Sequence, residues 1–246
     1  MTKNVIEFKN VTKIYGDATV LNNLTFSIPE GKVTTILGFS GAGKSTMMKH
    51  ILGLVHPTKG TITTLGVDMA TLDDLQLREF RRNFGMVFQY AALFDNLSSF
   101  ENIAFPLREF TKMKESEIKS KVTGLIKSVG LGPEATDRLP SELSGGMRKR
   151  VGLARALALE PRIMLYDEPT SGLDPISTQM VSELIVETAK HSDTKLTSLV
   201  ISHDVRASLR ISDHIMFLEK GNIVEFSTVE DFKNSQNATI RRFLEL

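Results

Sequence analysis

A glycine-rich segment that ends in a lysine and a serine is the part of the chain best suited to chemistry. It fits the pattern G-x-x-x-x-G-K-[ST] and runs Gly38-Phe39-Ser40-Gly41-Ala42-Gly43-Lys44-Ser45. A β-branched run precedes it and helical spacing follows, which is the context that the pattern requires. Glycines let backbone N–H groups surround phosphates, and a helix amino terminus favours negative charge. We therefore predict a phosphate-binding loop in which Lys44 reaches the β- and γ-phosphates, Ser45 holds Mg²⁺, and Thr46 belongs to the same binding set.

Two carboxylates, Asp167 and Glu168, directly follow the apolar run Ile163–Tyr166. In proteins with such a loop, an aspartate at the end of a strand completes the Mg²⁺ shell. The next carboxylate is placed to orient or deprotonate an attacking water. An acidic pair after a strand also serves as a helix cap or turn. The phosphate-binding loop favours the catalytic interpretation, with Asp167 on the metal and Glu168 as the base.

A second glycine-rich segment, Leu143-Ser144-Gly145-Gly146-Met147, stands before a helix predicted over Met147–Leu159. It offers another anion-binding helix terminus, and a plain helix cap is the alternative. Ser144 lies 23 residues before Asp167. In this order and spacing the chain resembles ATP-binding-cassette proteins, and the resemblance covers nearly its whole length.

The resemblance assigns roles to four further residues. Tyr15 matches the aromatic residue that stacks on adenine, although a tyrosine at a strand end also packs on a core. Gln89 matches the glutamine that senses Mg²⁺ and water and links to the membrane subunit. Asp174, in Ser171-Gly172-Leu173-Asp174, matches the loop that crosses the dimer interface. His203 matches the switch histidine that contacts the γ-phosphate.

The resemblance also implies ATP and Mg²⁺ as cofactors and a head-to-tail dimer of two copies. Each ATP site would combine the Lys44 loop of one copy with the turn at Ser144, Gly145 and Gly146 of the other. ATP binding would close the dimer, and hydrolysis with Glu168 as base would release it. That cycle would drive a partner between two conformations.

Predicted strands alternate with predicted helices, which indicates an α/β fold with a mainly parallel sheet. We expect strands at Val5–Ile14, Val20–Ile28, Val33–Leu37, Ile62–Leu65, Phe84–Phe88, Ile163–Tyr166, Leu196–Ser202, His214–Leu218 and Ile223–Phe226. We expect helices over Ser45–Leu54, Leu107–Val129, Arg150–Leu159, Ser177–Lys190 and twice within Val229–Leu246. The resemblance implies a P-loop NTPase core with an N-terminal antiparallel β-subdomain and an inserted helical subdomain. We predict one domain over 1–246, its core at about 1–89 and 151–246 and its helical subdomain at about 90–150.

The composition is that of an ordinary globular protein, with 41% hydrophobic and 24% charged residues among 246. The formal net charge of +1 argues against a protein held to nucleic acid by bulk charge. With no cysteine, the chain has neither disulfides nor thiolate metal sites. Because it shows no secretory signal and no run long enough to cross a bilayer, we expect a soluble, cytoplasmic chain. The resemblance implies that a permease holds it at the cytoplasmic face of a bacterial inner membrane.

Several classes compete for this pattern of motifs. A P-loop kinase or GTPase has no use for Ser144–Met147. A DNA-repair or translation cassette usually carries a long coiled coil or two cassettes, and only 98 residues separate Lys44 from Leu143. A separate ATPase subunit of a membrane transporter fits both facts.

The stretches Phe88–Asp95 and Asn102–Glu109 resemble the ATPases of Mla/Mce-type phospholipid transporters, as does Met147, where cassette signatures usually have glutamine. That resemblance implies a permease dimer, a membrane-anchored MCE-domain protein and, in some systems, a small STAS-domain protein as partners, and outer-membrane lipid asymmetry as the purpose. An importer of amino acids or other polar solutes is the alternative. The basic triplet Arg148–Arg150 is expected either to contact phosphate or a partner, or to be a solvated helix face.

Some Mla ATPases have a carboxy-terminal extension that grips the neighbouring copy. This sequence ends at Leu246, with little to reach across. We therefore expect the isolated ATPase to be largely monomeric without ATP, and sedimentation that shows a stable nucleotide-free dimer would overturn that expectation.

Overall fold

The computed structural model describes residues 3–190 and 195–245, and these residues form two compact units. Residues up to Arg81 and from Thr188 onward make the first unit, and Arg82–Glu187 make the second. Each unit is described by itself. The predicted division into a core and a helical subdomain stays a prediction.

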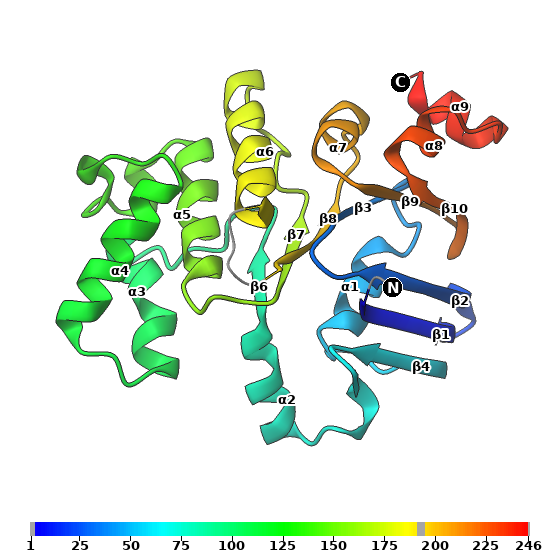
Figure 1. Ribbon diagram of the computed structural model, residues 1–246, viewed down its shortest axis with the longest axis horizontal. Helices are drawn as coiled ribbons and strands as arrows, with labels where there is room; N and C mark the ends of the chain where they lie inside the picture. Colours follow the sequence, from blue (N-terminus) through cyan, green and yellow to red (C-terminus); the bar gives the residue numbers. More distant parts are fainter. Residues whose placement is uncertain (1–2, 191–194, 246) are drawn as a thin grey trace. The chain divides into compact units, whose positions relative to one another are not determined.

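An antiparallel sheet opens the first unit (Figure 1). Its strands are β1 (Asn4–Tyr15), β2 (Ala18–Pro29), β4 (Lys59–Thr64) and β5 (Val67–Asp68), in the order β2-β1-β4-β5. Leu24, Phe26 and Ile28 are buried at alternate positions of β2, and the rings of Phe8 and Phe26 stack across the pair with their centroids 4.5 Å apart. A turn at Gly16-Asp17 brings the end of β1, with Tyr15, beside the start of β2.

The first unit also contains a largely parallel group of strands. They are β3 (Val33–Leu37), β8 (Thr197–Ile201), β9 (His214–Glu219) and β10 (Asn222–Thr228). β3 pairs in parallel with both β8 and β9, and β10 closes on β9 as the expected antiparallel hairpin. Lys220 and Gly221 both have positive φ, 47° and 76°, as a two-residue hairpin turn requires. β3 and β8 are buried along their whole length, which explains their continuous apolar and β-branched sequences.

The first unit has two helices, over Asp74–Phe80 and Val205–Ile211, that the sequence analysis did not predict. The helices of this unit are α1 (Lys44–Ile51), α2 (Asp74–Phe80), α7 (Val205–Ile211), α8 (Val229–Lys233) and α9 (Ala238–Leu244). α2 begins at a capping box between Asp73 and Gln76 and buries only Leu77, so its apolar periodicity is weak. α1 ends three residues before the predicted Leu54, because Gly53 takes a left-handed conformation with φ 63°.

The second unit consists of two parallel strands and four longer helices. The strands are β6 (Phe84–Val87) and β7 (Ile163–Asp167), and the helices are α3 (Ser99–Phe110), α4 (Glu115–Ser128), α5 (Gly145–Leu157) and α6 (Pro175–Lys190), whose last turn falls at the unit boundary. α3, α4 and α5 pack on one another (Figure 1). With the sheets above, this arrangement confirms the predicted mixed α/β fold.

The predicted helix over Leu107–Val129 is wrong in one respect, since the chain breaks between α3 and α4. Thr111 has extended dihedral angles, its hydroxyl donates to Leu107 O at 2.6 Å, and it accepts from Met113 N at 3.2 Å. A threonine that bonds to its own backbone in this way ends a helix. α5 also begins at Gly145 rather than Met147, because Ser144 is its cap.

His50 of α1 is a buried histidine. Its Nδ1 donates to Thr46 O at 2.7 Å, and Nε2 has no hydrogen-bond partner among the described residues. Burial lowers the pKa of His50, opposed by its bond to Thr46 and reinforced by the positive charge of Lys13. The imidazole is therefore held neutral.

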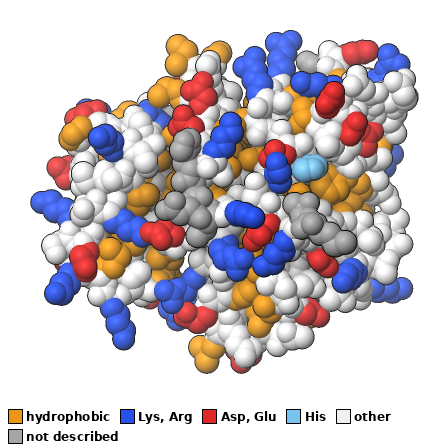
Figure 2. Space-filling view, viewed as in Figure 1, with side chains coloured by type: hydrophobic (Ala, Val, Ile, Leu, Met, Phe, Trp, Pro, Cys, Tyr) orange, Lys and Arg blue, Asp and Glu red, His pale blue; other side chains and the backbone are white. Residues whose placement is uncertain are grey.

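In the described part of the chain, no helix combines the length and apolarity needed to span a bilayer. Basic and acidic side chains are interspersed on the face drawn in Figure 2, as the net charge of +1 suggests.

Candidate functional site

The loop between β3 and α1 has a backbone that only glycines satisfy. Gly38 has φ 149°, and a Cβ there would lie 2.1 Å from Leu218 O. Gly43 has φ 106°, and its Cβ would lie 2.8 Å from Val20 O. The Lys44 ammonium folds over the loop and donates to the carbonyls of Gly38 at 2.6 Å and Phe39 at 3.0 Å. A compact cradle of backbone groups with a cation at its mouth suits a phosphate group.

Two other predicted residues of the first unit lie near this loop. β3 and β8 are parallel neighbours, so His203, which follows β8, emerges at the same sheet edge as the loop that follows β3. Val20 belongs to the hairpin that carries Tyr15, and its contact with Gly43 places that hairpin end beside the loop. Tyr15 is 46% exposed, and Lys13 Nζ lies 4.7 Å from its ring centroid. An exposed ring at this edge is suited to stacking.

The second unit brings together Gln89 and the acidic residues after β7. Val87 pairs with Tyr166, so Gln89 and Glu168 each follow the paired residues by two positions at the same edge. Gln89 Nε2 donates to Ser171 Oγ at 3.3 Å, which leaves Oε1 as the carboxamide's acceptor atom. Glu168 has φ 49°, an uncommon conformation for a residue with a side chain. Asp167 ends β7 directly before it.

The predicted anion-binding turn lies at the amino end of α5, against the start of α6. Ser144 caps α5, with Oγ accepting from Met147 N at 3.2 Å. Gly146 faces Ser177 so closely that a Cβ would lie 2.9 Å from its hydroxyl. Asp174 accepts hydrogen bonds from Ser177, and these lower the pKa of its carboxyl. The starts of α5 and α6 therefore lie together. Gly145 and Gly146 have no side chains, so only their backbone atoms are present at this turn.

The basic triplet after this turn contacts backbone carbonyls. Arg148 donates to Leu143 O at 2.6 Å, and Arg150 donates to Gly130 O at 2.7 Å. Lys149 is buried and donates to Ser171 O at 2.6 Å. The expectation of a solvated helix face is therefore wrong for Lys149, because this position of α5 faces the end of β7.

Two polar residues that the sequence analysis missed fix the loop after Gln89. Arg155 donates to Ala91 O and Ala92 O, each at 2.9 Å, and both alanines have positive φ. Asn102 is fully buried and bonds the backbone of 94–98. A buried asparagine within an apolar helix face is the one sequence signal that could have indicated this network.

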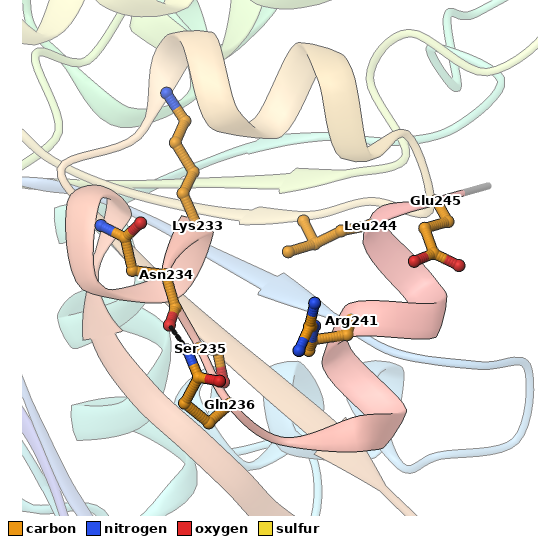
Figure 3. Close-up of a pocket in the computed structure, with 7 residues that line it drawn as sticks. All are labelled: Lys233, Asn234, Ser235, Gln236, Arg241, Leu244 and Glu245. Carbon is orange, nitrogen blue, oxygen red and sulfur yellow. Dashed lines mark hydrogen bonds between the residues drawn. The ribbon is translucent and has the colours of Figure 1, made fainter.

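An open pocket of about 340 Å³ lies between the carboxyl-terminal helices of the first unit (Figure 3). It is lined by Lys233, Asn234, Ser235, Gln236, Arg241, Leu244 and Glu245. None of these is a predicted site residue, so the pocket is separate from the candidate site. Next to it in sequence, Phe243 packs on Phe39 of the glycine-rich loop, with ring centroids 5.4 Å apart.

Comparison with known proteins gives a family match and several extensive similarities. The family model described as ABC transporter matches residues 21–171. The chain is 42% identical over 239 residues to the probable ribonucleotide transport ATP-binding protein mkl of Mycobacterium leprae, covering 97% of this chain and 68% of that protein. It is 40% identical over 245 residues to the intermembrane phospholipid transport system ATP-binding protein MlaF of Haemophilus influenzae, and the match covers 100% of this chain and 92% of that protein. It is 38% identical over 245 residues to the methionine import ATP-binding protein MetN 1 of Shouchella clausii, and the match covers 98% of this chain and 70% of that protein.

Among solved structures, the dimeric post-hydrolysis state of the ATP-binding cassette MJ0796, bound to ADP and Pi, has a TM-score of 0.82 and 33% identity. The match covers 91% of this chain and 98% of that one. The chain spans about two thirds of the length of the mycobacterial relatives.

Proposed function

Because the chain belongs to the ABC transporter family, and is an ATPase whose hydrolysis is coupled to transport, we propose that its transporter moves phospholipid between the inner and outer membranes of a bacterial envelope. The similarity to MlaF, 40% identity over 245 residues and 92% of that protein, carries this proposal. The stretch from Gln89 to Glu109 and Met147 support it, since these are the positions at which the sequence resembles phospholipid transporter ATPases.

In the ATP site proposed here, each predicted residue has a distinct role. Tyr15 stacks on adenine, the backbone of the loop surrounds the phosphates, and Lys44 exchanges its two loop carbonyls for phosphate oxygens. Glu168 orients and deprotonates the attacking water, and His203 contacts the γ-phosphate. The geometry of the loop backbone supports the phosphate role most directly.

Mg²⁺ is proposed as the metal that accompanies ATP. Ser45, Gln89 and Asp167 would hold it through a hydroxyl, a carboxamide and a carboxylate oxygen, the donor type that Mg²⁺ prefers. Gln89 fits because its Nε2 is bonded to Ser171, so the oxygen is the atom offered to a cation. When bound, the ion neutralises phosphate charge.

A head-to-tail dimer of two copies is proposed as the active form. Ser144, Gly145 and Gly146 of one copy would bind the ATP held by the other, with Asp174 at the interface. The position of these residues at the amino end of α5 supports this role, since a helix amino terminus suits an anion. The solved structure of the ATP-binding cassette MJ0796, which is a dimer bound to ADP and Pi, supports a dimer as the active form.

The surface around the loop after Gln89 is proposed as the place where a permease docks. Phe94 and Phe105 are partly exposed and pack ring to ring at 4.9 Å, and Tyr90 is 85% exposed. Exposed aromatic residues are typical of protein interfaces. Binding to a permease dimer there would hold the chain at the cytoplasmic face of the inner membrane, with an MCE-domain protein and a STAS-domain protein as further partners.

Import of methionine or another polar solute is the second candidate. The 38% identity to MetN 1 favours it, because that value is close to the identity with MlaF. An ATPase does not touch the transported substrate, so its sequence discriminates weakly between the two functions.

Two experiments test the proposal. Lys44→Ala should lose tight ATP binding, whereas Glu168→Gln should bind ATP and not hydrolyse it; normal turnover by Glu168→Gln would refute the assignment of the base. Affinity purification through this chain from its native host should recover a permease with bound phospholipid, as measured by mass spectrometry. Recovery of a permease loaded with methionine would support the second candidate and exclude the first.

A further inference from the structure

Lys149 is a buried lysine on the helix that begins at the Ser144-Gly145-Gly146 turn. It is 6% exposed, and its ammonium donates to Ser171 O at 2.6 Å and to Glu168 O at 3.4 Å. Burial lowers the pKa of Lys149, while the negative charge of Glu168 acts in the opposite direction. Burying an ammonium costs free energy unless acceptors surround it, so these two carbonyl groups account for its presence.

Glu168, one of the two acceptors, has a strained backbone. Its φ of 49° is left-handed, a region that is strained for a residue with a side chain. Its carbonyl oxygen accepts from Ser171 N at 3.2 Å as well as from Lys149. Such a conformation persists only where surrounding groups fix it. Here the Ser171 amide and the Lys149 ammonium, which both donate to the Glu168 carbonyl, help to fix it.

Ser171 joins the same groups. Its amide donates to Glu168 O, its carbonyl accepts from Lys149, and its hydroxyl accepts from Gln89 at 3.3 Å. Lys149 therefore connects the start of α5 with the end of β7 and with the loop after β6, all inside the second unit.

We propose that Lys149 is a positioning residue for ATP hydrolysis, which holds Glu168 in the left-handed conformation that directs its carboxylate. This inference rests on the proposed role of Glu168 as the base. Lys149 does not touch the nucleotide in this scheme; it acts through the carbonyl groups of Glu168 and Ser171. Removing it should lower turnover and leave ATP binding intact.

The test replaces Lys149 with methionine, which keeps the length of the side chain and removes its donors. We expect kcat to fall about 10- to 100-fold, the range that small misplacement of a catalytic group causes. The KM for ATP and the affinity for a fluorescent ATP analogue should stay within about twofold, since they report ground-state binding. Lys149→Arg, which keeps the donors, should recover part of kcat. Lys119→Met, the same change on the exposed side of α4, is the matched control and should leave kcat unchanged.

Thermal unfolding and a double mutant separate positioning from a merely structural role. In a Glu168→Gln background, which binds ATP without turnover, Lys149→Met should leave the affinity for ATP within about twofold, because the lysine acts on the base and not on the nucleotide. The inference is overturned by wild-type kcat in Lys149→Met, or by a joint fall of kcat, ATP affinity and Tm that Lys149→Arg does not reverse. If Lys149→Met does not fold, Lys149→Gln, with a neutral donor on a shorter arm, must show the same selective loss of kcat.

The variant Glu168→Gln distinguishes a failure of the proposed base from a failure of the inference on Lys149. If it hydrolyses ATP normally, the proposed base is wrong whatever Lys149 does. If it is inactive while Lys149→Met turns over like the wild type, the inference on Lys149 alone fails.

Discussion

Replacing Asn102 with alanine should release the loop that connects β6 with α3. The Asn102 carboxamide accepts from Phe94 N at 2.8 Å and donates to Phe94 O, Leu97 O and Ser98 O at 3.0–3.2 Å. The side chain is fully buried, so its hydrogen bonds satisfy backbone groups of the loop that would otherwise bond to water. Alanine removes all of them and leaves the helix propensity of α3 no worse.

The magnitude follows from at most three full hydrogen bonds, because the two amide hydrogens of Asn102 are shared among its three carbonyl acceptors. Each contributes about 0.5–1.5 kcal/mol net, and loop carbonyls that turn to water recover part of the loss. We therefore expect local opening of the loop to become easier by about 2–4 kcal/mol. At 1.4 kcal/mol per factor of ten, that is about a 30- to 700-fold rise in the opening equilibrium.

Amide hydrogen exchange of residues 94–102 measures this opening directly, because the Phe94 amide donates to Asn102 itself. Exchange elsewhere in the chain should change little. Asn96→Ala, at an exposed position of the same loop, is the control and should exchange like the wild type. A rise of less than about twofold for Phe94 in Asn102→Ala would refute the reasoning, since the loss of one bond worth only about 0.5 kcal/mol already gives that.

Three further changes have expected outcomes that separate measurements can check. Burial lowers the pKa of His50, so the unfolded chain binds its proton first, and the stability measured by urea unfolding should fall as the pH drops below about 6.5. The fall should be smaller in His50→Gln, where the lowered pKa of the partly buried His214 still contributes to it. Gly38→Ala should lower both Tm and ATP affinity, because its Cβ would meet Leu218 O at 2.1 Å, whereas Gly66→Ala, with open space at its Cβ, should lower Tm only by its backbone strain. Arg155→Lys loses the fork that holds two loop carbonyls, so limited chymotrypsin digestion should cut within 88–94 faster than in the wild type, and equal rates would count against that role.

Features set by neighbouring residues were predictable from the sequence. The glycine-rich loop between β3 and α1 and the hairpin at Lys220-Gly221 appear where the pattern places them, because positive φ angles favour glycine and its neighbours. The buried strands β3 and β8 were recognisable from short runs rich in β-branched and apolar residues. The assigned roles of the site residues stay predictions.

Misses occurred where a side chain bonded the backbone or where a helix face was ambiguous. Thr111 ends α3 through its own hydroxyl, a contact that apolar periodicity does not register. α2 buries only Leu77, so its cap from Asp73 was the stronger signal. Lys149 stands between two arginines, and three consecutive basic residues do not reveal which of them faces inward.

The sequence by itself determined the kind of chemistry, since phosphate-binding glycines, a lysine and paired carboxylates have a fixed local spacing. Only the tertiary structure decided that Lys149, Gln89 and Glu168 meet at Ser171. These residues lie on separate elements, and the pairing of β6 with β7 and the packing of α5 bring them together. Spacing along a chain fixes contacts within a loop or a helix turn, whereas contacts between elements depend on which buried faces pack against each other.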